Sequence, residues 1–140
     1  MSLAKILVVD DEAEIVRAVT MRLRAAGYEV LAANDGLMAT KLALHEAPDL
    51  VIMDIGIPCG DGHAVASSLL NNVATMSTPV IYLTARTADE DRLRAKENCV
   101  AGYLTKPFKA DELLSTVARA LAVKSLRTGS AQIALASAAI

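Results

Sequence analysis

Short apolar runs alternate with longer amphipathic runs five times along this chain. The apolar runs are rich in Val, Ile and Leu, and they predict strands that are buried on both faces of a sheet. Parallel strands need long crossover connections, so the alternation predicts an α/β fold: a five-stranded parallel sheet with helices on both faces, doubly wound because crossovers are right-handed. The predicted strands are Lys5–Asp10, Tyr28–Ala33, Leu50–Asp54, Pro79–Leu83 and Gly102–Leu104.

The amphipathic runs carry signals for where helices begin and end. Asp11 and Glu14 resemble a capping box at the start of the first helix, and Gly27 is expected to stop it. The second helix follows the turn Asn34-Asp35-Gly36 and ends before Pro48. Three further helices are predicted over about His63 to Asn71, Asp89 to Glu97, and Ala110 to Val123.

Composition limits the classes of function. Hydrophobic residues make up 54% of the chain and the formal net charge is -2, which indicates one globular domain, expected over residues 1–123. No Lys/Arg-rich run is present, so direct nucleic-acid binding is not expected. No apolar stretch approaches the roughly 20 residues of a membrane span. The two cysteines, Cys59 and Cys99, lack metal-ligand spacing and predict reduced thiols in a cytoplasmic protein.

Residues 124–140 combine a polar hinge with an apolar end. They predict a tail, or a linker stump to an output domain.

Polar side chains follow the predicted strands, at the sheet edge where parallel α/β folds bind ligands. Asp10 and Asp11 follow the first strand, Asp54 ends the third, and Thr84 and Lys106 follow the fourth and fifth. Carboxylates gathered in a partly desolvated crevice repel one another, and a divalent cation relieves that repulsion. An all-oxygen site favours Mg²⁺. The set predicts phosphoryl transfer with a carboxylate as nucleophile.

Each of these residues taken alone also has an ordinary structural explanation. Asp11 would cap a helix, Asp54 would be a polar residue at a strand end, and Thr84 would open a loop. Lys106 would be a solvated surface lysine. The functional interpretation therefore depends on all of them falling at one edge of the sheet.

Four stretches of the sequence resemble the receiver domains of response regulators, such as the single-domain chemotaxis regulator. They are ILVVDDE (6–12), DLVIMDIGIPCGDG (49–62), PVIYLTA (79–85) and GYLTKPF (102–108), in the order and spacing of that family. The resemblance covers about residues 4–123. It implies a flavodoxin-like (βα)5 fold with strand order 2-1-3-4-5. It also implies a phospho-accepting switch of a two-component system rather than a conventional enzyme.

The same resemblance implies a role for each site residue. Asp54 would be the phospho-acceptor, and Mg²⁺ would be bound by Asp11, by Asp10 through water, by Asp54 and by the backbone carbonyl of Gly56.

Two further pairs of residues follow from the resemblance. Lys106 would contact the phosphoryl group, and its peptide bond to Pro107 would be cis. Thr84 and Tyr103 would form a switch pair, in which the Tyr103 ring turns inward when Thr84 moves toward the phosphoryl oxygen. Phosphorylation would then change the face formed by the fourth helix, the fifth strand and the fifth helix.

The implied partners are a sensor histidine kinase or phosphotransfer protein as donor, and a downstream protein or attached output domain. Glu14, Arg17 and Ala18 on the first helix are a candidate docking face. Ala101-Gly102 stands where winged-helix transcription regulators carry two acidic residues, and Thr116 and Ala118 stand where they favour arginines. The salt-bridged dimer face of those regulators is therefore not expected, which favours other outputs, although a phosphorylation-dependent dimer stays open.

Two alternative functions remain open on this fold. A flavin-binding electron carrier would need a Ser/Thr/Gly loop after the first strand, where this chain has Asp10-Asp11-Glu12. A magnesium-dependent phosphohydrolase would place its two aspartates as D-x-D, whereas here they are adjacent. Colour of the purified protein would reveal a flavin, and turnover of small phosphate esters would reveal a hydrolase.

Overall fold

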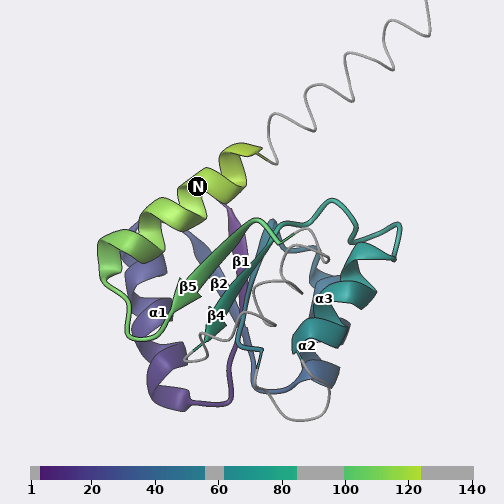
Figure 1. The fold of residues 1–140 in the computed structure, drawn as a ribbon, viewed down its shortest axis with the longest axis horizontal. Coiled ribbons are helices and arrows are strands. Elements are labelled where there is room, and N and C mark those ends of the chain that lie inside the picture. Colours follow the sequence, from purple (N-terminus) through teal and green to yellow (C-terminus); the bar gives the residue numbers. More distant parts are fainter. Residues whose placement is uncertain (1–3, 56–61, 85–99, 124–140) are drawn as a thin grey trace, which may run out of the picture.

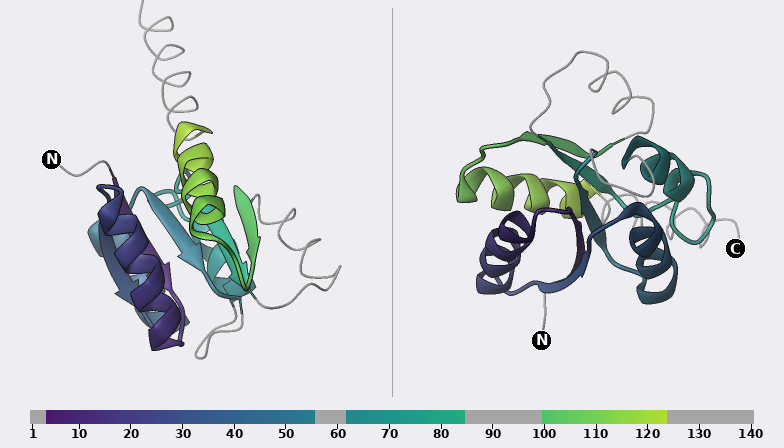
Figure 2. Two further views of the ribbon diagram at one scale, coloured as in Figure 1. Left: turned by 90° about the vertical axis from the view of Figure 1, so that its left-hand side faces the viewer. Right: turned by 90° about the horizontal axis from the view of Figure 1, so that it is seen from below.

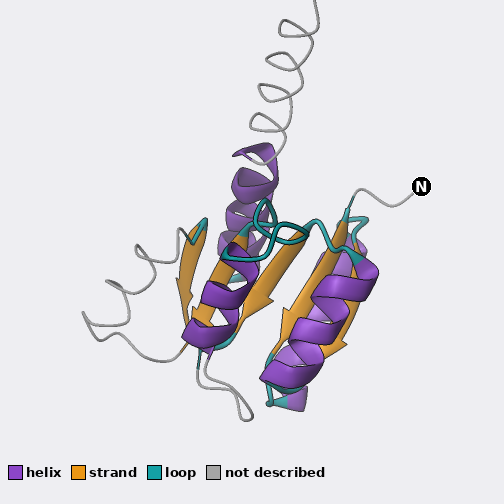
Figure 3. Cartoon of the chain, turned by 90° about the vertical axis from the view of Figure 1, so that its right-hand side faces the viewer, coloured by secondary structure: helices purple, strands orange, loops and turns teal. Residues whose placement is uncertain are grey.

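Five apolar segments pair into one parallel sheet in the computed structural model, which describes residues 4–55, 62–84 and 100–123 (Figure 1). The strand order is β2-β1-β3-β4-β5, so the predicted fold class and order are confirmed. All four pairings are parallel, and the strands run in one direction in Figure 3. The strands are β1 (Lys5–Val9), β2 (Glu29–Ala33), β3 (Leu50–Met53), β4 (Val80–Thr84) and β5 (Gly102–Thr105).

Each face of the sheet has its own hydrophobic core. Side chains alternate along a strand, so in β1 Leu7 and Val9 face one layer while Ile6 and Val8 face the other. Helices α2 (Gly36–Glu46) and α3 (Gly62–Leu70) cover the first layer. Helix α1 (Ala13–Ala25) and the helix over residues 110–123 cover the second (Figures 1 and 2). Burial on both faces explains why the central strands are continuous apolar runs.

The start of α1 differs from the prediction. Its N-cap residue is Glu12, whose side chain makes no capping hydrogen bond, so the expected capping box of Asp11 and Glu14 is wrong. The backbone N–H of Glu12 donates instead to the Asp10 carboxylate at 2.9 Å. This hydrogen bond ties the start of α1 to the end of β1, and it leaves Asp11 exposed.

The other helix ends follow their sequence signals. Gly27 has a φ of 97°, a conformation that glycine adopts without strain, and it ends α1 as predicted. Asp35 caps α2 by accepting a hydrogen bond from the Met38 backbone at 2.8 Å. None of the described helices is long and apolar enough to cross a membrane. The helix predicted over 89–97 and the tail 124–140 lie outside the described residues.

Candidate functional site

Asp10 and Asp54 lie side by side because their strands are neighbours in register. Val9 of β1 pairs with Met53 of β3, and each aspartate is the next residue along its chain. The Asp54 N–H donates to the Val9 carbonyl at 2.9 Å, which extends the ladder by one residue. Both residues are buried, with relative exposures of 1% for Asp10 and 8% for Asp54. The sheet register therefore fixes both carboxylates at its carboxyl edge.

Gly62 allows α3 to begin against the backbone of Asp54. A Cβ at this position would lie 2.5 Å from the Ile55 Cα and 2.7 Å from the Asp54 carbonyl oxygen, closer than such atoms approach in proteins. The Gly62 N–H also donates to the Ile55 carbonyl at 3.3 Å. A side chain here would push the helix away from the segment that carries Asp54.

The Lys106 ammonium joins three carboxylates at this edge. Its Nζ lies 2.8 Å from Asp10 Oδ2, 3.2 Å from Asp54 Oδ2 and 3.2 Å from Glu12 Oε1. The lysine follows β5 and reaches across 96 residues of sequence to Asp10. Asp10, Asp54 and Lys106, which the sequence places at strand ends, are thus brought together.

Burial and charge act in opposite directions on the ionisation of this cluster. For Asp10, burial is the largest influence and raises the pKa, which the hydrogen bond from Lys106 only partly offsets. For Lys106, burial works to lower the pKa, but the hydrogen bond to Asp10 and the charges of Asp10 and Asp54 outweigh it and raise the pKa. The lysine is firmly protonated, while Asp10 is a buried carboxylate with too little positive charge around it.

The carboxylates are arranged so that they could hold a metal ion. One oxygen from each of Asp10, Asp11, Glu12 and Asp54 lies within 4.8 Å of the others. Asp11 and Glu12 are exposed, whereas Asp10 and Asp54 are buried, so the cluster opens to solvent on one side. Glu12 was not among the residues predicted from the sequence, although its place in the run Asp10-Asp11-Glu12 is a signal that could have identified it.

The remaining predicted residues are described only in part. Thr84 ends β4 and pairs with Thr105 of β5. The Thr84 side chain and the whole of Gly56 lie outside the described part of the chain. The Lys106–Pro107 peptide bond is cis. Tyr103 lies on β5 and is half-buried.

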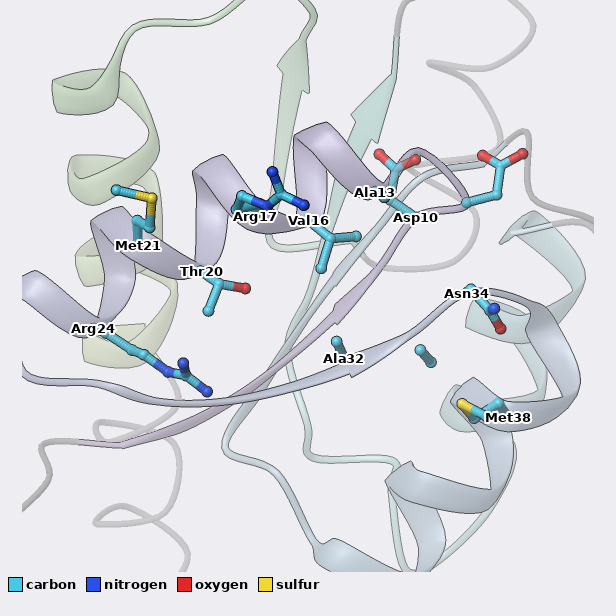
Figure 4. A pocket seen from close by; sticks show the side chains of 12 residues that line it. Asp10, Ala13, Val16, Arg17, Thr20, Met21, Arg24, Ala32, Asn34 and Met38 are labelled. Carbon is cyan, nitrogen blue, oxygen red and sulfur yellow. The ribbon is translucent and has the colours of Figure 1, made fainter.

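A groove runs from the carboxylate cluster along α1. It has a volume of about 630 Å³ and is lined by α1, by the end of β2 and by Met38 of α2 (Figure 4). Asp10 lies at one end of the groove and Arg24 at the other, with Arg17 and Thr20 between them. Arg17, which the sequence analysis placed on a candidate docking face, therefore borders the same opening as the carboxylates.

Sequence reasoning gave no role to a buried polar pair beneath the site. His63 Nδ1 and the Tyr82 hydroxyl are 3.0 Å apart, and their side chains come from α3 and β4. The relative exposures are 4% for His63 and 0% for Tyr82. An isolated histidine at a helix start and a tyrosine within a strand give no signal of this contact.

Comparison with known proteins identifies the family of the chain. The family model for the response regulator receiver domain matches residues 6–118. The transcriptional regulatory protein KdpE of Mycobacterium tuberculosis is 38% identical over 116 residues, which is 83% of this chain and 50% of the relative. PhoP of Bacillus subtilis, a transcriptional regulatory protein of alkaline phosphatase synthesis, is 38% identical over 81% of this chain and 46% of the relative. The chain thus spans about half the length of these curated relatives.

A solved structure extends the similarity to a protein of comparable length. The chemotaxis response regulator CheY4 of Vibrio cholerae is 34% identical, with a TM-score of 0.80 over 85% of this chain and 99% of that one. The family model and the curated relatives agree with this likeness. The chain belongs to the response regulator receiver domain family, the phosphorylation-dependent signalling switches of two-component systems.

Proposed function

We propose that Asp54 is the residue that accepts the phosphoryl group, from a phosphohistidine on a sensor histidine kinase or phosphotransfer protein. The observation that carries the proposal is the Lys106 ammonium, 3.2 Å from Asp54 and 2.8 Å from Asp10 at the open edge of the sheet. An Asp54 carboxylate oxygen forms the bond to phosphorus while the phosphorus–nitrogen bond breaks, and the imidazole nitrogen keeps the electron pair. Lys106 would neutralise charge on the transferred group.

The acidic cluster would hold Mg²⁺ through Asp10, Asp11 and Asp54, with the Gly56 carbonyl as a further ligand. The donor set supports this assignment, because clustered carboxylate oxygens suit a hard divalent cation and one buried carboxylate has a raised pKa. When bound, the ion supplies positive charge that offsets both the carboxylates and the incoming phosphoryl oxygens. Glu12 is outside this ligand set and would keep its contact with Lys106.

We further propose that Thr84 and Tyr103 carry the signal away from Asp54. Tyr82 of β4 pairs with Tyr103 of β5, which puts the Tyr103 ring on the face covered by α2 and α3. Phosphorylation would shift an existing equilibrium of Tyr103 and change the face formed by the helix predicted over about 89–97, β5 and the helix over residues 110–123. The protein would act on its own Asp54 and would not turn over a separate substrate, so it is not a conventional enzyme.

Residues 1–123 would form the receiver unit, and residues 124–140 a tail or linker to an output domain. The output would be that domain or a separate protein, and a phosphorylation-dependent dimer is compatible with either. Several relatives are named transcriptional regulators, which weakens the sequence argument against a transcriptional output. We propose that the described unit itself contacts neither nucleic acid nor membrane. A cytoplasmic location would follow from the intracellular phosphodonor.

Mass spectrometry of the intact protein tests the chemistry. Incubation with acetyl phosphate and Mg²⁺ should add about 80 Da, the mass of one phosphoryl group. Asp54→Ala should abolish the adduct, whereas Asp111→Ala, which removes an exposed aspartate on the helix over residues 110–123, should leave it unchanged. An adduct that persists in Asp54→Ala, or that forms equally well without Mg²⁺, would contradict the proposal.

A further inference from the structure

Tyr82 lies in a row of side chains that crosses the sheet directly beneath the site. In register it stands between Met53, the residue before Asp54, and Tyr103 of β5. Side chains opposite one another on parallel strands point to the same face, so the three line one layer under the carboxyl edge. Tyr82 is therefore placed between the segment that carries the acceptor and the proposed switch residue.

The Tyr82 ring is held from the side of α3. Its hydroxyl is completely buried, and a buried hydroxyl is costly unless it is hydrogen-bonded. His63 Nδ1 lies 3.0 Å from that hydroxyl, and the two ring centroids are 5.0 Å apart at an interplanar angle of 70°. His63 follows Gly62, which packs on the Asp54 backbone. The histidine thus links the start of α3, next to the acceptor, to the orientation of Tyr82.

The Tyr103 ring rests on Tyr82. The two centroids are 6.3 Å apart at 62°, an edge-to-face arrangement that is favourable beyond the burial of area alone. Tyr103 is half-buried. Any loosening of Tyr82 should therefore weaken the present orientation of Tyr103.

We propose that Tyr82 is a positioning residue for the Tyr103 switch, with its ring held in place by His63. The pair favours the orientation in which the Tyr103 ring lies against Tyr82, and thereby affects how tightly a phosphoryl group or its mimic binds at Asp54. This inference rests on the proposed function, because it assumes that Tyr103 responds to occupancy at Asp54.

The variant Tyr82→Phe tests the proposal by removing only the hydroxyl. Beryllofluoride with Mg²⁺ serves as the phosphoryl mimic, with affinity measured by calorimetric titration. Affinity should change by about two- to tenfold, the amount expected when one aromatic contact that favours a single orientation of Tyr103 is weakened. In the free protein, the aromatic NMR signals of Tyr103 should shift. The control Tyr28→Phe, which loses a hydroxyl on the opposite face of the sheet, should change neither quantity.

A double-mutant cycle separates positioning from a general loss of stability. His63→Leu, which leaves the Tyr82 side chain itself intact, should change affinity in the same direction as Tyr82→Phe. The double variant removes both partners of this hydrogen bond. Its fold-change in affinity should therefore be smaller than the product of the two single fold-changes. Unchanged beryllofluoride binding in Tyr82→Phe, or independent effects of the two substitutions in the cycle, would overturn the proposal even if the variants melt at lower temperature.

The design also separates failure of this inference from failure of the proposed function. If the wild-type protein does not bind beryllofluoride with Mg²⁺, the phospho-acceptor assignment fails. The Tyr103 signals of the free variants still report on positioning in that case. Signals unchanged by both Tyr82→Phe and His63→Leu would overturn the role of the pair independently of any ligand.

Discussion

Lys106 Nζ and Asp10 Oδ2 are 2.8 Å apart, and the Asp10 side chain has 0% relative exposure. The same ammonium also lies 3.2 Å from Asp54 and 3.2 Å from Glu12, so one positive charge is shared among three negative ones. This sharing raises the pKa of the lysine but does not offset the burial of Asp10, whose pKa is also raised. Without a bound cation, this cluster therefore has too little positive charge for its three carboxyl groups.

Asp10→Asn should stabilise the metal-free protein at neutral pH. The pKa of Asp10 is raised above its ordinary value of 3.8, so ionisation of this group costs stability once the pH exceeds its folded pKa. Asparagine keeps the shape without the charge, and the Tm should rise by about 2–4 °C. Calorimetry in the presence of a chelator measures this change in Tm. Glu29→Gln, at an exposed position of the edge strand β2, should leave the Tm unchanged, and a lower Tm for Asp10→Asn would contradict the sign.

The stabilising effect of Asp10→Asn should depend on pH. A carboxyl group whose pKa is raised in the folded state lowers the stability of the fold as the pH rises from its unfolded pKa through its folded pKa. The loss of stability is complete above that range. The Tm difference between Asp10→Asn and the wild-type protein should therefore shrink as the pH is lowered toward the ordinary value of 3.8. A difference that stays constant, or that widens toward acid, would show that the charge of Asp10 is not its cause.

Asp11 should matter for Mg²⁺ but not for the metal-free fold. Its side chain is exposed, and the capping bond expected of it is absent. Mg²⁺ that binds the folded protein raises the Tm by mass action. Asp11→Asn should leave the metal-free Tm within about 1 °C, the range of an ordinary surface substitution, and should remove most of the rise. An undiminished magnesium response would exclude Asp11 as a ligand.

Lys106→Met should destabilise the metal-free protein, because it removes the cation that three carboxylates share. Hydrogen bonds to charged groups predict a loss of about 1.5–3 kcal/mol in the free energy of unfolding. Saturating Mg²⁺ should recover part of that loss, since it restores positive charge at the same carboxylates. Denaturant unfolding with and without Mg²⁺ provides the comparison, and Lys106→Arg serves as the charge-retaining control. Equal losses in the free energy of unfolding with and without Mg²⁺ would show that the lysine and the metal do not act on the same carboxylates.

The sequence was sufficient for the sheet and for the ends of its strands. Apolar runs identify strands that are buried on both faces, and Asp10, Asp54 and Lys106 follow such runs directly. The parallel register then brings these three together. The cis peptide bond before Pro107 and the proposed switch role of Thr84 and Tyr103 came only from resemblance to the family.

Other features depend on tertiary contacts that the sequence pattern does not contain. The capping box was wrong because Asp10, held at the end of β1, accepts the Glu12 N–H and starts α1 one residue later than expected. Glu12 joins the site because Lys106 reaches it from β5, across 94 residues. The contact between His63 and Tyr82 joins a helix to a strand. The spacing of apolar residues around either one does not indicate that the other is near.

The most direct test of the central claim is to locate the phosphoryl group. Borohydride reduces an aspartyl phosphate to homoserine, so treatment after incubation with acetyl phosphate and Mg²⁺ marks the acceptor for peptide mass spectrometry. We predict homoserine at position 54, dependent on both acetyl phosphate and Mg²⁺. Homoserine at position 10 or 11, or no conversion at position 54 in protein that carries the phosphoryl mass, would contradict the assignment of Asp54.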